Sequence, residues 1–416
     1  MTYTCVGDGD LTMHGHPLIV GGSQTYSKGP AALPANAPRY ATWGYGPCIF
    51  AETTDPDRVQ RYIDCMAALG AVILGYRHDV VDEAVRDQLA DGVSFSLPTW
   101  LEGLLAERLV TLMPKGDWQC RFGKNGTEVV SRAVRLARAH TGRDRVLMYP
   151  NGYHGSEDWS MTRPPRNGGV PDAVRGLTSF VERHDLTGIA AAFEALGPAC
   201  LVFEAVVSTD PVLPPANYFR ELRALADRFG VLLVLDEMVT GFRCDIPGAV
   251  RKWDIRPDLV CFGKAMANGW PVSALVGRRE IMHRIETDVF MSSTFGGEAA
   301  SLAAAVATID VIRREGVPER LAELGTALTV AYRNEAKRLG LDTDVYGYPQ
   351  RLVTRWADPE QRRLFLEALI DRGVLCAGYF NLTLAMCDRA VSDALLDAVR
   401  DALQAVAAAA VERRAA

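Results

Sequence analysis

Two short apolar runs, each followed by a charged side chain, constrain this chain most. Val231 to Leu235 is continuously apolar and leads into Asp236, while Leu259 to Phe262 leads through a glycine into Lys264. A continuous apolar run bounded by polar residues is typical of a strand covered on both faces. Because sites in parallel sheets collect at the carboxyl ends of the strands, we expect Asp236 and Lys264 to project into one crevice.

An amine and a carboxylate in one crevice indicate a particular chemistry. A lysine amine can condense with an aldehyde, and a buried aspartate can hold a pyridine nitrogen protonated, which makes the ring an electron sink. That division of labour is what pyridoxal 5'-phosphate requires. Taken singly, each residue has an ordinary alternative: Asp236 could cap a helix, and Lys264 could lie on the surface after a strand.

Composition limits the classes of function. With 416 residues, 48% of them hydrophobic and 23% charged, the chain can form one large domain and one smaller one. A net charge of −6 predicts no nucleic-acid partner and no membrane surface. The nine cysteines are scattered, and the chain starts without a signal-like segment, so we expect reduced thiols and a cytoplasmic protein. The seven histidines lack metal-ligand spacing, so no metal site is predicted.

The middle of the chain alternates short apolar runs with helical stretches. Predicted strands are Gln119 to Phe122, Val146 to Tyr149, Cys200 to Glu204, Val231 to Asp236, Leu259 to Phe262 and Val272 to Val276. Predicted helices between them are Thr127 to His140, Leu186 to Leu196 and Tyr218 to Phe229. This alternation predicts an α/β fold with a mostly parallel sheet covered by helices on both faces.

The C-terminal part predicts a smaller α+β unit. Expected helices are Ala299 to Glu315, Glu319 to Leu339, Ala357 to Gly373 and Val391 to Arg414, with a short strand near Val374 to Leu384. We predict an N-terminal arm at 1–59 that belongs partly to the small domain, a large domain at 60–290 and a mainly small-domain part at 291–416.

The sequences around the two charged residues resemble known motifs. Leu-Asp-Glu-Met-Val-Thr-Gly-Phe-Arg, which contains Asp236 and Met238, and Phe-Gly-Lys-Ala-Met-Ala-Asn-Gly, which contains Lys264, closely resemble motifs of class III aminotransferases. Within that class they look most like the glutamate-1-semialdehyde aminomutase group, and the resemblance covers nearly the whole chain. It implies a type I transferase fold, a pyridoxal phosphate cofactor held by Lys264, and catalytic roles for Lys264 and Asp236, with Met238 beside the cofactor.

A glycine-containing loop before a predicted helix resembles the phosphate-binding loop of this family. The family pattern is Asn-Ser-Gly-Thr-Glu, and here the order is Lys-Asn-Gly-Thr-Glu, with Asn125 where serine is usual. A helix N-terminus can bind a phosphate through free N–H groups and its dipole. The resemblance therefore implies that Asn125, Gly126 and Thr127 contact the cofactor phosphate.

Three further motifs resemble the family. The motif Asn-Gly-Tyr-His-Gly implies that Tyr153 stacks on the pyridine ring and that His154 is a supporting hydrogen-bond partner. The strand-end Glu204 corresponds to a family glutamate and would form part of the wall of the site near the ring. The loop Met-Ser-Ser-Thr-Phe-Gly-Gly implies that Thr294 reaches the phosphate of a neighbouring subunit. A homodimer with shared active sites is therefore expected.

The arm departs from the aminomutases proper. Those enzymes carry Ser-Pro-Val-Arg, whose arginine holds a substrate carboxylate, and here the stretch is Thr-Tyr-Ser-Lys, with Tyr26 and Lys28. Lysine cannot reproduce the planar fork of arginine, and Leu69 replaces a family tryptophan. These versions resemble a branch associated with sugar amination in polysaccharide and antibiotic pathways. We therefore predict a carbohydrate or aminoglycoside substrate contacted by Tyr26, Lys28 and Leu69.

Three hypotheses follow. The first is an aminotransferase that moves an amino group from a small-molecule donor to a carbonyl acceptor. The second is an isomerase with the same site, either an aminomutase or an epimerase at the amine-bearing carbon, which would need a proton acceptor on the face opposite Lys264. The third is a binding protein that has kept the fold without the chemistry, and the intact Asp236 and Lys264 argue against it.

Overall fold

The two apolar runs form neighbouring parallel strands. In the computed structural model, which describes residues 18–52 and 59–415, β8 (Leu232–Asp236) pairs with β9 (Leu259–Phe262), and Val234 lies opposite Leu259. Nearly every side chain in both strands is buried, because the sheet is covered on both faces. The carboxyl ends of β8 and β9 therefore meet at one edge of the sheet.

These strands lie inside a seven-stranded sheet, in the order β4-β10-β9-β8-β7-β5-β6. The other strands are β4 (Trp118–Gly123), β5 (Val146–Met148), β6 (Thr178–Phe180), β7 (Cys200–Phe203) and β10 (Ser273–Arg278). Only β10 among them is antiparallel to its neighbours, β4 and β9. The predicted α/β fold with a mostly parallel sheet is confirmed, whereas β6 was not predicted.

Helices with clear end signals cover this sheet. The longer ones are α4 (Gly126–Thr141), α6 (Leu186–Leu196) and α7 (Tyr218–Phe229), and the short ones are α5 (Asp172–Arg175), α8 (Ala249–Lys252), α9 (Arg279–Met282) and α10 (Arg284–Thr287). Asn125 caps the start of α4, and a left-handed glycine, Gly142, ends it. α4 packs against β9 and β10, and α7 packs against β8. The bounds of α6 and α7 are those predicted from the sequence.

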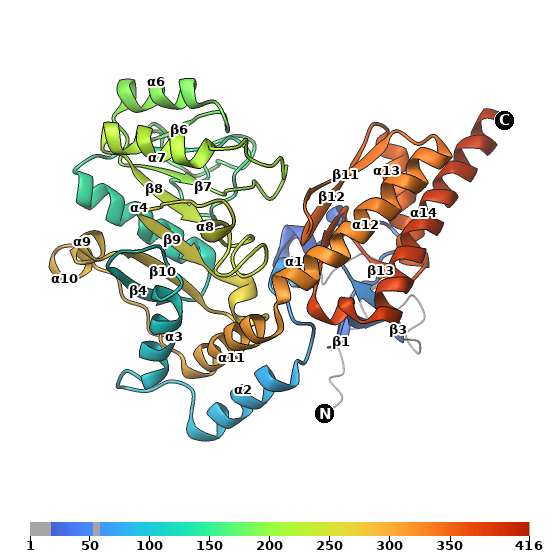
Figure 1. The fold of residues 1–416 in the computed structure, drawn as a ribbon, viewed down its shortest axis with the longest axis horizontal. Coiled ribbons are helices and arrows are strands. Elements are labelled where there is room, and N and C mark those ends of the chain that lie inside the picture. The colour runs from blue at the N-terminus through green and yellow to red at the C-terminus, as the bar shows by residue number, and fades with distance from the viewer. Residues whose placement is uncertain (1–17, 53–58, 416) are drawn as a thin grey trace.

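A long, alanine-rich helix joins the two domains (Figure 1). α11 (Ala299–Glu315) is buried along most of its length and packs against α2 (Asp79–Asp91), α3 (Trp100–Val110) and the 3₁₀ turn η4 (Lys264–Ala267). Small side chains allow this close approach. α11 therefore supports the turn that begins at Lys264.

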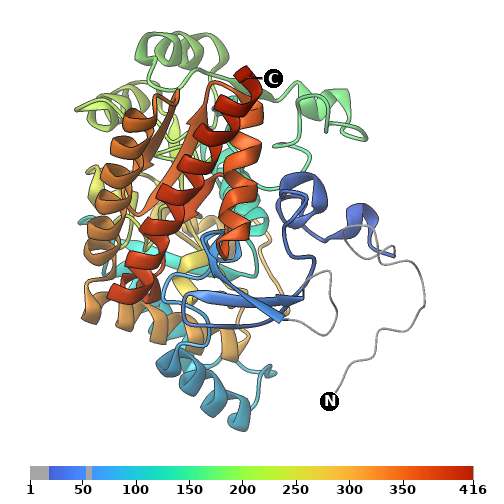
Figure 2. The same cartoon turned by 90° about the vertical axis from the view of Figure 1, so that its right-hand side faces the viewer.

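The small domain contains two sheets. One is β1 (Ala41–Tyr45), β2 (Cys48–Glu52), β3 (Val59–Asp64) and β13 (Val374–Leu375); the other is β11 (Thr343–Tyr348), β12 (Arg351–Trp356) and β14 (Tyr379–Asn381). Their helices are α1 (Ala67–Gly70), α12 (Val317–Leu339), α13 (Pro359–Asp371) and α14 (Arg389–Ala415). Figure 2 shows α14, in red, on the outer face beside α12 and α13.

The single strand predicted near Val374 to Leu384 is wrong. That stretch forms β13 and β14, which belong to different sheets, and then the 3₁₀ turn η5 (Leu384–Cys387). The hairpin of β11 and β12 was not predicted. Its strands lack the continuous apolar run that identified β8 and β9.

The N-terminal segment begins with three short turns, η1 (Val20–Gly22), η2 (Tyr26–Lys28) and η3 (Pro30–Ala32). It continues into β1 and β2, which were not predicted, and β2 pairs with β3. Strand pairing therefore crosses the predicted limit near residue 59. The limits 1–59, 60–290 and 291–416 remain our proposal, and residues 1–17 and 53–58 lie outside the described part.

Two general features concern the described residues. None of their helices combines the length and the apolar character needed to cross a membrane. Eight cysteines fall within the described ranges, and all eight are free thiols.

Candidate active site

Asp236 and Lys264 line one cavity of about 340 Å³ at the carboxyl edge of the large sheet. Asp236 is the last residue of β8, and Lys264 follows β9 after one glycine. The following residues, all predicted from the sequence to belong to the site, line this cavity and form its wall: Asn125, Gly126, Thr127, Tyr153, His154, Glu204, Asp236, Met238 and Lys264. Nine residues from five separate stretches of the chain thus converge on one space.

Asp236 is buried and held by two hydrogen bonds. Its Oδ2 lies 2.8 Å from Nδ1 of His154, and its Oδ1 accepts a bond of 2.9 Å from the backbone N–H of Met238. Only 2% of the Asp236 surface is exposed. These two hydrogen bonds fix Asp236 in place. Because a carboxylate oxygen can accept more than one hydrogen bond, Asp236 can still accept one from a protonated ring nitrogen. His154 therefore has a positioning role here.

Lys264 is held in an uncommon backbone conformation. Its φ is +48°, in the left-handed region that residues other than glycine rarely adopt. Burial lowers the pKa of its amine, although the negative charges of Asp236 and Glu204 act in the opposite direction. A lowered pKa increases the fraction of neutral amine, which is the nucleophilic form.

The start of α4 forms a cradle beside these two residues. The Asn125 side chain accepts a bond of 3.0 Å from the Glu128 N–H, so its oxygen serves as the helix N-cap. A Cβ at Gly126 would lie 2.9 Å from the Met238 sulfur, and a Cβ at Gly263 would lie 2.8 Å from it. The side chain of Met238 therefore packs against both glycines, and a larger residue at either position would have to displace it.

Tyr153 and Glu204 complete the described wall. Tyr153 is 56% exposed, so it lies at the mouth of the cavity. Glu204 is buried and accepts a bond of 2.5 Å from the Ser208 N–H. Burial raises the pKa of Glu204, and the nearby charge of Asp236 adds to this effect.

Four predicted residues do not lie in this wall. Lys28 and Leu69 line a separate cavity of about 410 Å³, together with Asp64 and Tyr76. Tyr26 is exposed, with the guanidinium carbon of Arg166 4.0 Å from its ring centre. Thr294 is also exposed and does not line the cavity that contains Lys264.

Sequence reasoning missed other residues of the cavity. Ser208, Trp270 and Ser273 line it, and Ser273 Oγ donates a bond of 2.9 Å to the Asn125 carbonyl. Asn268 fixes the loop after Lys264, because its Oδ1 accepts the N–H groups of two residues in the 73–74 segment. Nearness in sequence to Lys264 was the available signal for Trp270 and Asn268.

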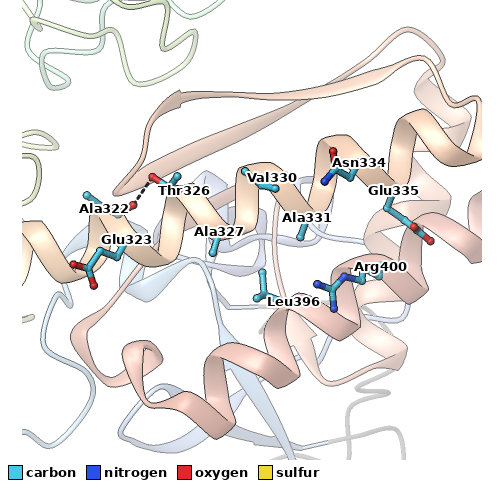
Figure 3. Close-up of a pocket in the computed structure, with 10 residues that line it drawn as sticks. All are labelled: Ala322, Glu323, Thr326, Ala327, Val330, Ala331, Asn334, Glu335, Leu396 and Arg400. Carbon is cyan, nitrogen blue, oxygen red and sulfur yellow. Dashed lines mark hydrogen bonds between the residues drawn. The ribbon is translucent and has the colours of Figure 1, made fainter.

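A larger hollow lies elsewhere (Figure 3). It is an open groove of about 790 Å³ between α12 and α14, lined largely by small or aliphatic residues such as Ala327, Val330 and Leu396. No lysine and none of the motif residues lines it. The residues predicted to be catalytic therefore line the smaller cavity and not this groove.

Glu237, next to Asp236, is fully buried and supports the loop after β8. It accepts hydrogen bonds from the Thr240 hydroxyl and, at 2.8 Å, from the Val250 N–H. Burial raises its pKa from 4.5 to about 7. The folded state therefore keeps a proton that the unfolded state loses between about pH 4.5 and pH 7.

This difference predicts a pH effect on stability. Because the folded state binds more protons in that window, Glu237 should lower the free energy of unfolding as pH rises, by on the order of 3 kcal/mol. Glu237→Gln should remove this contribution while keeping the bond from Val250. Chemical denaturation of the wild-type protein and of Glu237→Gln between about pH 4.5 and pH 7 measures the free energy of unfolding of each. If both free energies changed with pH in parallel, the prediction would be contradicted.

The residues of the cavity fit pyridoxal phosphate. The strand-end carboxylate is held by His154, whose buried Nε2 has no hydrogen-bond partner among the described residues. Within the described ranges, no carboxylate lies within 4.0 Å of the Lys264 amine, so no ion pair holds that amine away from an aldehyde. Gly126 and Thr127, at the start of α4, line the cavity where a helix N-terminus would bind the phosphate.

Comparisons with known proteins identify the family of this chain. The profile of the family described as aminotransferase class-III matches residues 53–407. Glutamate-1-semialdehyde 2,1-aminomutase from Pelotomaculum thermopropionicum is 36% identical over 296 residues, which cover 68% of each chain.

Solved structures show the same fold. The FumI protein of Sphingopyxis sp. MTA144, solved with PLP, has a TM-score of 0.86 at 30% identity and covers 94% of both chains. An omega-transaminase from Sphaerobacter thermophilus has a TM-score of 0.83 at 27% identity, covering 94% of this chain and 95% of that one. The chain therefore belongs to the class III aminotransferases and is a pyridoxal phosphate-dependent enzyme, either a transaminase or an isomerase.

Proposed function

We propose that the enzyme is an aminotransferase that delivers an amino group to a carbonyl-bearing carbohydrate or aminoglycoside intermediate, in secondary metabolism or polysaccharide biosynthesis. The observation that carries this proposal is Lys28, in place of the arginine that holds the substrate carboxylate in the aminomutases proper. The 410 Å³ cavity that Lys28 lines also contains Ser23, Gln24, Asp64 and Tyr76. In this proposal such polar groups bind the hydroxyls of a sugar whose reacting carbon extends to Lys264 in the neighbouring cavity.

Each cavity residue has a proposed role. Bound pyridoxal phosphate supplies an aldehyde and an electron-withdrawing ring. Lys264 holds it through the side-chain amine and afterwards moves a proton at the substrate carbon, as general base and acid. Asp236, fixed by His154, keeps the ring nitrogen protonated, and Tyr153 excludes water from the ring face.

The proposed enzyme is a homodimer. Large apolar side chains are exposed on two neighbouring segments, Phe95, Leu97 and Trp100 on one and Phe290 and Phe295 on the other. The Ala299 N–H donates to the Val93 carbonyl at 2.9 Å, so the two segments lie side by side. Thr294, exposed within this surface, would then reach the neighbouring subunit's cofactor phosphate.

Light scattering of the purified enzyme measures this assembly. A molecular mass near twice 45.4 kDa is expected, and a mass near 45.4 kDa at all concentrations would contradict it.

Isomerisation remains the second candidate, because the aminomutase relative shares 36% identity. Turnover of an amino sugar in deuterated water distinguishes an isomerase from an aminotransferase. Isotope uptake without net keto product supports an isomerase, and amino transfer to a second molecule supports the proposal.

The substrate test compares glutamate-1-semialdehyde with a panel of keto sugars, amino sugars and aminoglycosides. Loss of a bidentate contact should leave glutamate-1-semialdehyde with a kcat/KM roughly 100- to 1,000-fold below that of the best sugar. Lys28→Arg alone should not restore it, because Leu69 also differs from the family and lines the same cavity. Efficient turnover of glutamate-1-semialdehyde with none of the sugars would overturn the carbohydrate proposal.

A further inference from the structure

Lys124 connects the starts of two helices. It comes directly before Asn125, the N-cap of α4, and it lines the cavity of the candidate active site. Its Nζ donates to Oε2 of Glu298 at 2.8 Å and to Oγ of Ser301 at 3.4 Å. Glu298 is the N-cap of α11, and its other carboxylate oxygen accepts the Ala300 N–H at 2.8 Å. One ion pair therefore ties the start of α4 to the start of α11.

This ion pair is largely shielded from water. Only 21% of the Lys124 side chain and 12% of the Glu298 side chain are exposed, so salt screens the pair less than it screens the ion pairs on the surface. Although burial raises the pKa of Glu298, the bonds from Lys124 and Ser301 hold it below its usual value. The family pattern has asparagine at the place of Lys124, and an asparagine carries no charge to pair with Glu298. The connection is therefore particular to the loop of this chain.

The segment 290–298, which precedes α11, is anchored at its other end to the same part of the sheet. Three arginines of β4 and α4 donate to consecutive backbone carbonyls of this segment, Arg121 to Met291 at 3.1 Å, Arg132 to Ser292 at 3.3 Å and Arg135 to Phe290 at 3.3 Å. Thr294 and Phe295 lie between the two anchors, and both are exposed. β4 and α4 therefore fix both ends of the segment that we assign to the subunit interface.

We propose that the ion pair of Lys124 and Glu298 couples binding of the cofactor phosphate to formation of the dimer. Gly126 and Thr127, which follow Lys124, line the cavity where the start of α4 would bind that phosphate. A start of α4 that is fixed by a phosphate also fixes Lys124, and through it the position of Glu298. Because coupling between two binding events is reciprocal, dimer formation then raises the affinity for the phosphate by the same factor.

The inference rests on the proposed homodimer and deepens it, because it names the contact through which each subunit responds to its own cofactor. Lys124 is a positioning residue in this account, since it acts through Glu298 and the segment 290–298. The three arginines hold the far end of that segment whether or not a phosphate is bound. The ion pair is the anchor that begins in the phosphate-binding loop itself.

The test compares the wild-type enzyme with Lys124→Gln and uses Arg108→Gln as the matched control. Arg108 pairs with Asp310 of α11 at 3.0 Å but does not line the cavity, so the control removes a different ion pair to the same helix. Exchange of subunits between two fluorescently labelled samples is measured with pyridoxal phosphate and with pyridoxal, which lacks the phosphate. In the wild type and in Arg108→Gln, we expect exchange to be about 10-fold slower with pyridoxal phosphate than with pyridoxal. In Lys124→Gln the two rates should agree within about twofold.

Titration of the apoenzyme with each compound gives the reciprocal measurement. We expect Lys124→Gln to raise the Kd for pyridoxal phosphate about 10-fold and to change the Kd for pyridoxal by less than about twofold. Lys124→Arg keeps the positive charge and should retain the wild-type response in both measurements. If Lys124→Gln does not fold, Glu298→Gln removes the opposite charge and keeps an oxygen for the Ala300 N–H, and it must lose the response to the phosphate.

Other outcomes decide against the coupling. An equal response to the phosphate in the wild type and in Lys124→Gln would overturn it, and an equal loss in Arg108→Gln would assign Lys124 only a general support of α11. A wild-type monomer in light scattering would reject the homodimer together with the coupling, whereas a dimer that exchanges at one rate with both compounds would reject the coupling alone. No substrate is used, so neither result affects the carbohydrate proposal.

Discussion

Lys264→Ala is expected to abolish turnover, with a loss of at least about four powers of ten in kcat. The variant removes both the amine that holds the cofactor and the group that moves a proton at the substrate carbon. The amine is buried at the strand end with its pKa lowered, which favours the nucleophilic form. Steady-state kinetics and the loss of the visible absorption of the bound cofactor measure the effect.

A second lysine makes this assignment testable. Lys124 also lines the cavity, but its Nζ is engaged in an ion pair of 2.8 Å with the carboxylate of Glu298. Borohydride reduction of the wild-type enzyme, followed by peptide mapping, should place the label on Lys264. A label on Lys124 would refute the assignment. Lys337→Ala, on the exposed surface of α12, is the control and should leave kcat unchanged.

The parts of the fold that the sequence predicts well are those in which the pattern is local. The predicted bounds of α6, α7, α11 and β9 agree with the structure, because apolar spacing marks each element and a left-handed glycine follows each of these helices. Buried strands such as β8 and β9 are recognisable because both faces require apolar residues. The antiparallel direction of β10 could not be predicted in this way, because an apolar run does not encode which way a strand runs in the sheet.

The short strands of the small domain have no such local pattern. β13 and β14 are a few residues apart in sequence but pair with different sheets, β13 with β3 and β14 with β12. β13 pairs with a strand more than 300 residues earlier in the chain (Val374 opposite Ile63), whereas β14 pairs with one about 30 residues earlier (Asn381 opposite Arg351). β12 has the composition of an exposed strand, although it carries the buried Arg351. Pattern alone could therefore not place this strand inside the protein.

The same distinction applies to the site. Asp236 and Lys264 were predicted to meet because the sheet itself brings strand ends together, whereas Glu204 was predicted beside them from the family resemblance. Lys28 and Leu69 belong to turns, and Leu69 has a left-handed φ of +61°. Their place around a second cavity depends on how the arm folds onto the small domain, which sequence spacing does not determine.

Asp236→Asn is expected to fold and to lose roughly three powers of ten in kcat, since a neutral amide does not hold the ring nitrogen protonated. The amide oxygen can still accept the bond from the Met238 N–H, and the amide nitrogen can donate to Nδ1 of His154. His154 then carries its proton on Nε2, which has no partner in the described structure. The hydrogen-bonded frame therefore survives while the negative charge is lost.

A second buried aspartate, Asp258, provides the matched control. Its replacement measures the general cost of removing a buried carboxylate, without any loss of charge at the cofactor ring. Asp258 immediately precedes β9, away from the cavity, and accepts bonds of 2.8 Å from the Leu233 N–H and from Arg223. Asp258→Asn should lower thermal stability, because the ion pair with Arg223 is weakened, yet leave kcat of the folded enzyme within about twofold. Asp236→Asn should show the opposite, a small change in Tm with a large loss of kcat. Near-wild-type turnover in Asp236→Asn, or equal losses of kcat in both variants, would contradict the role of Asp236, because a residue that acts through its charge on the ring must separate activity from stability.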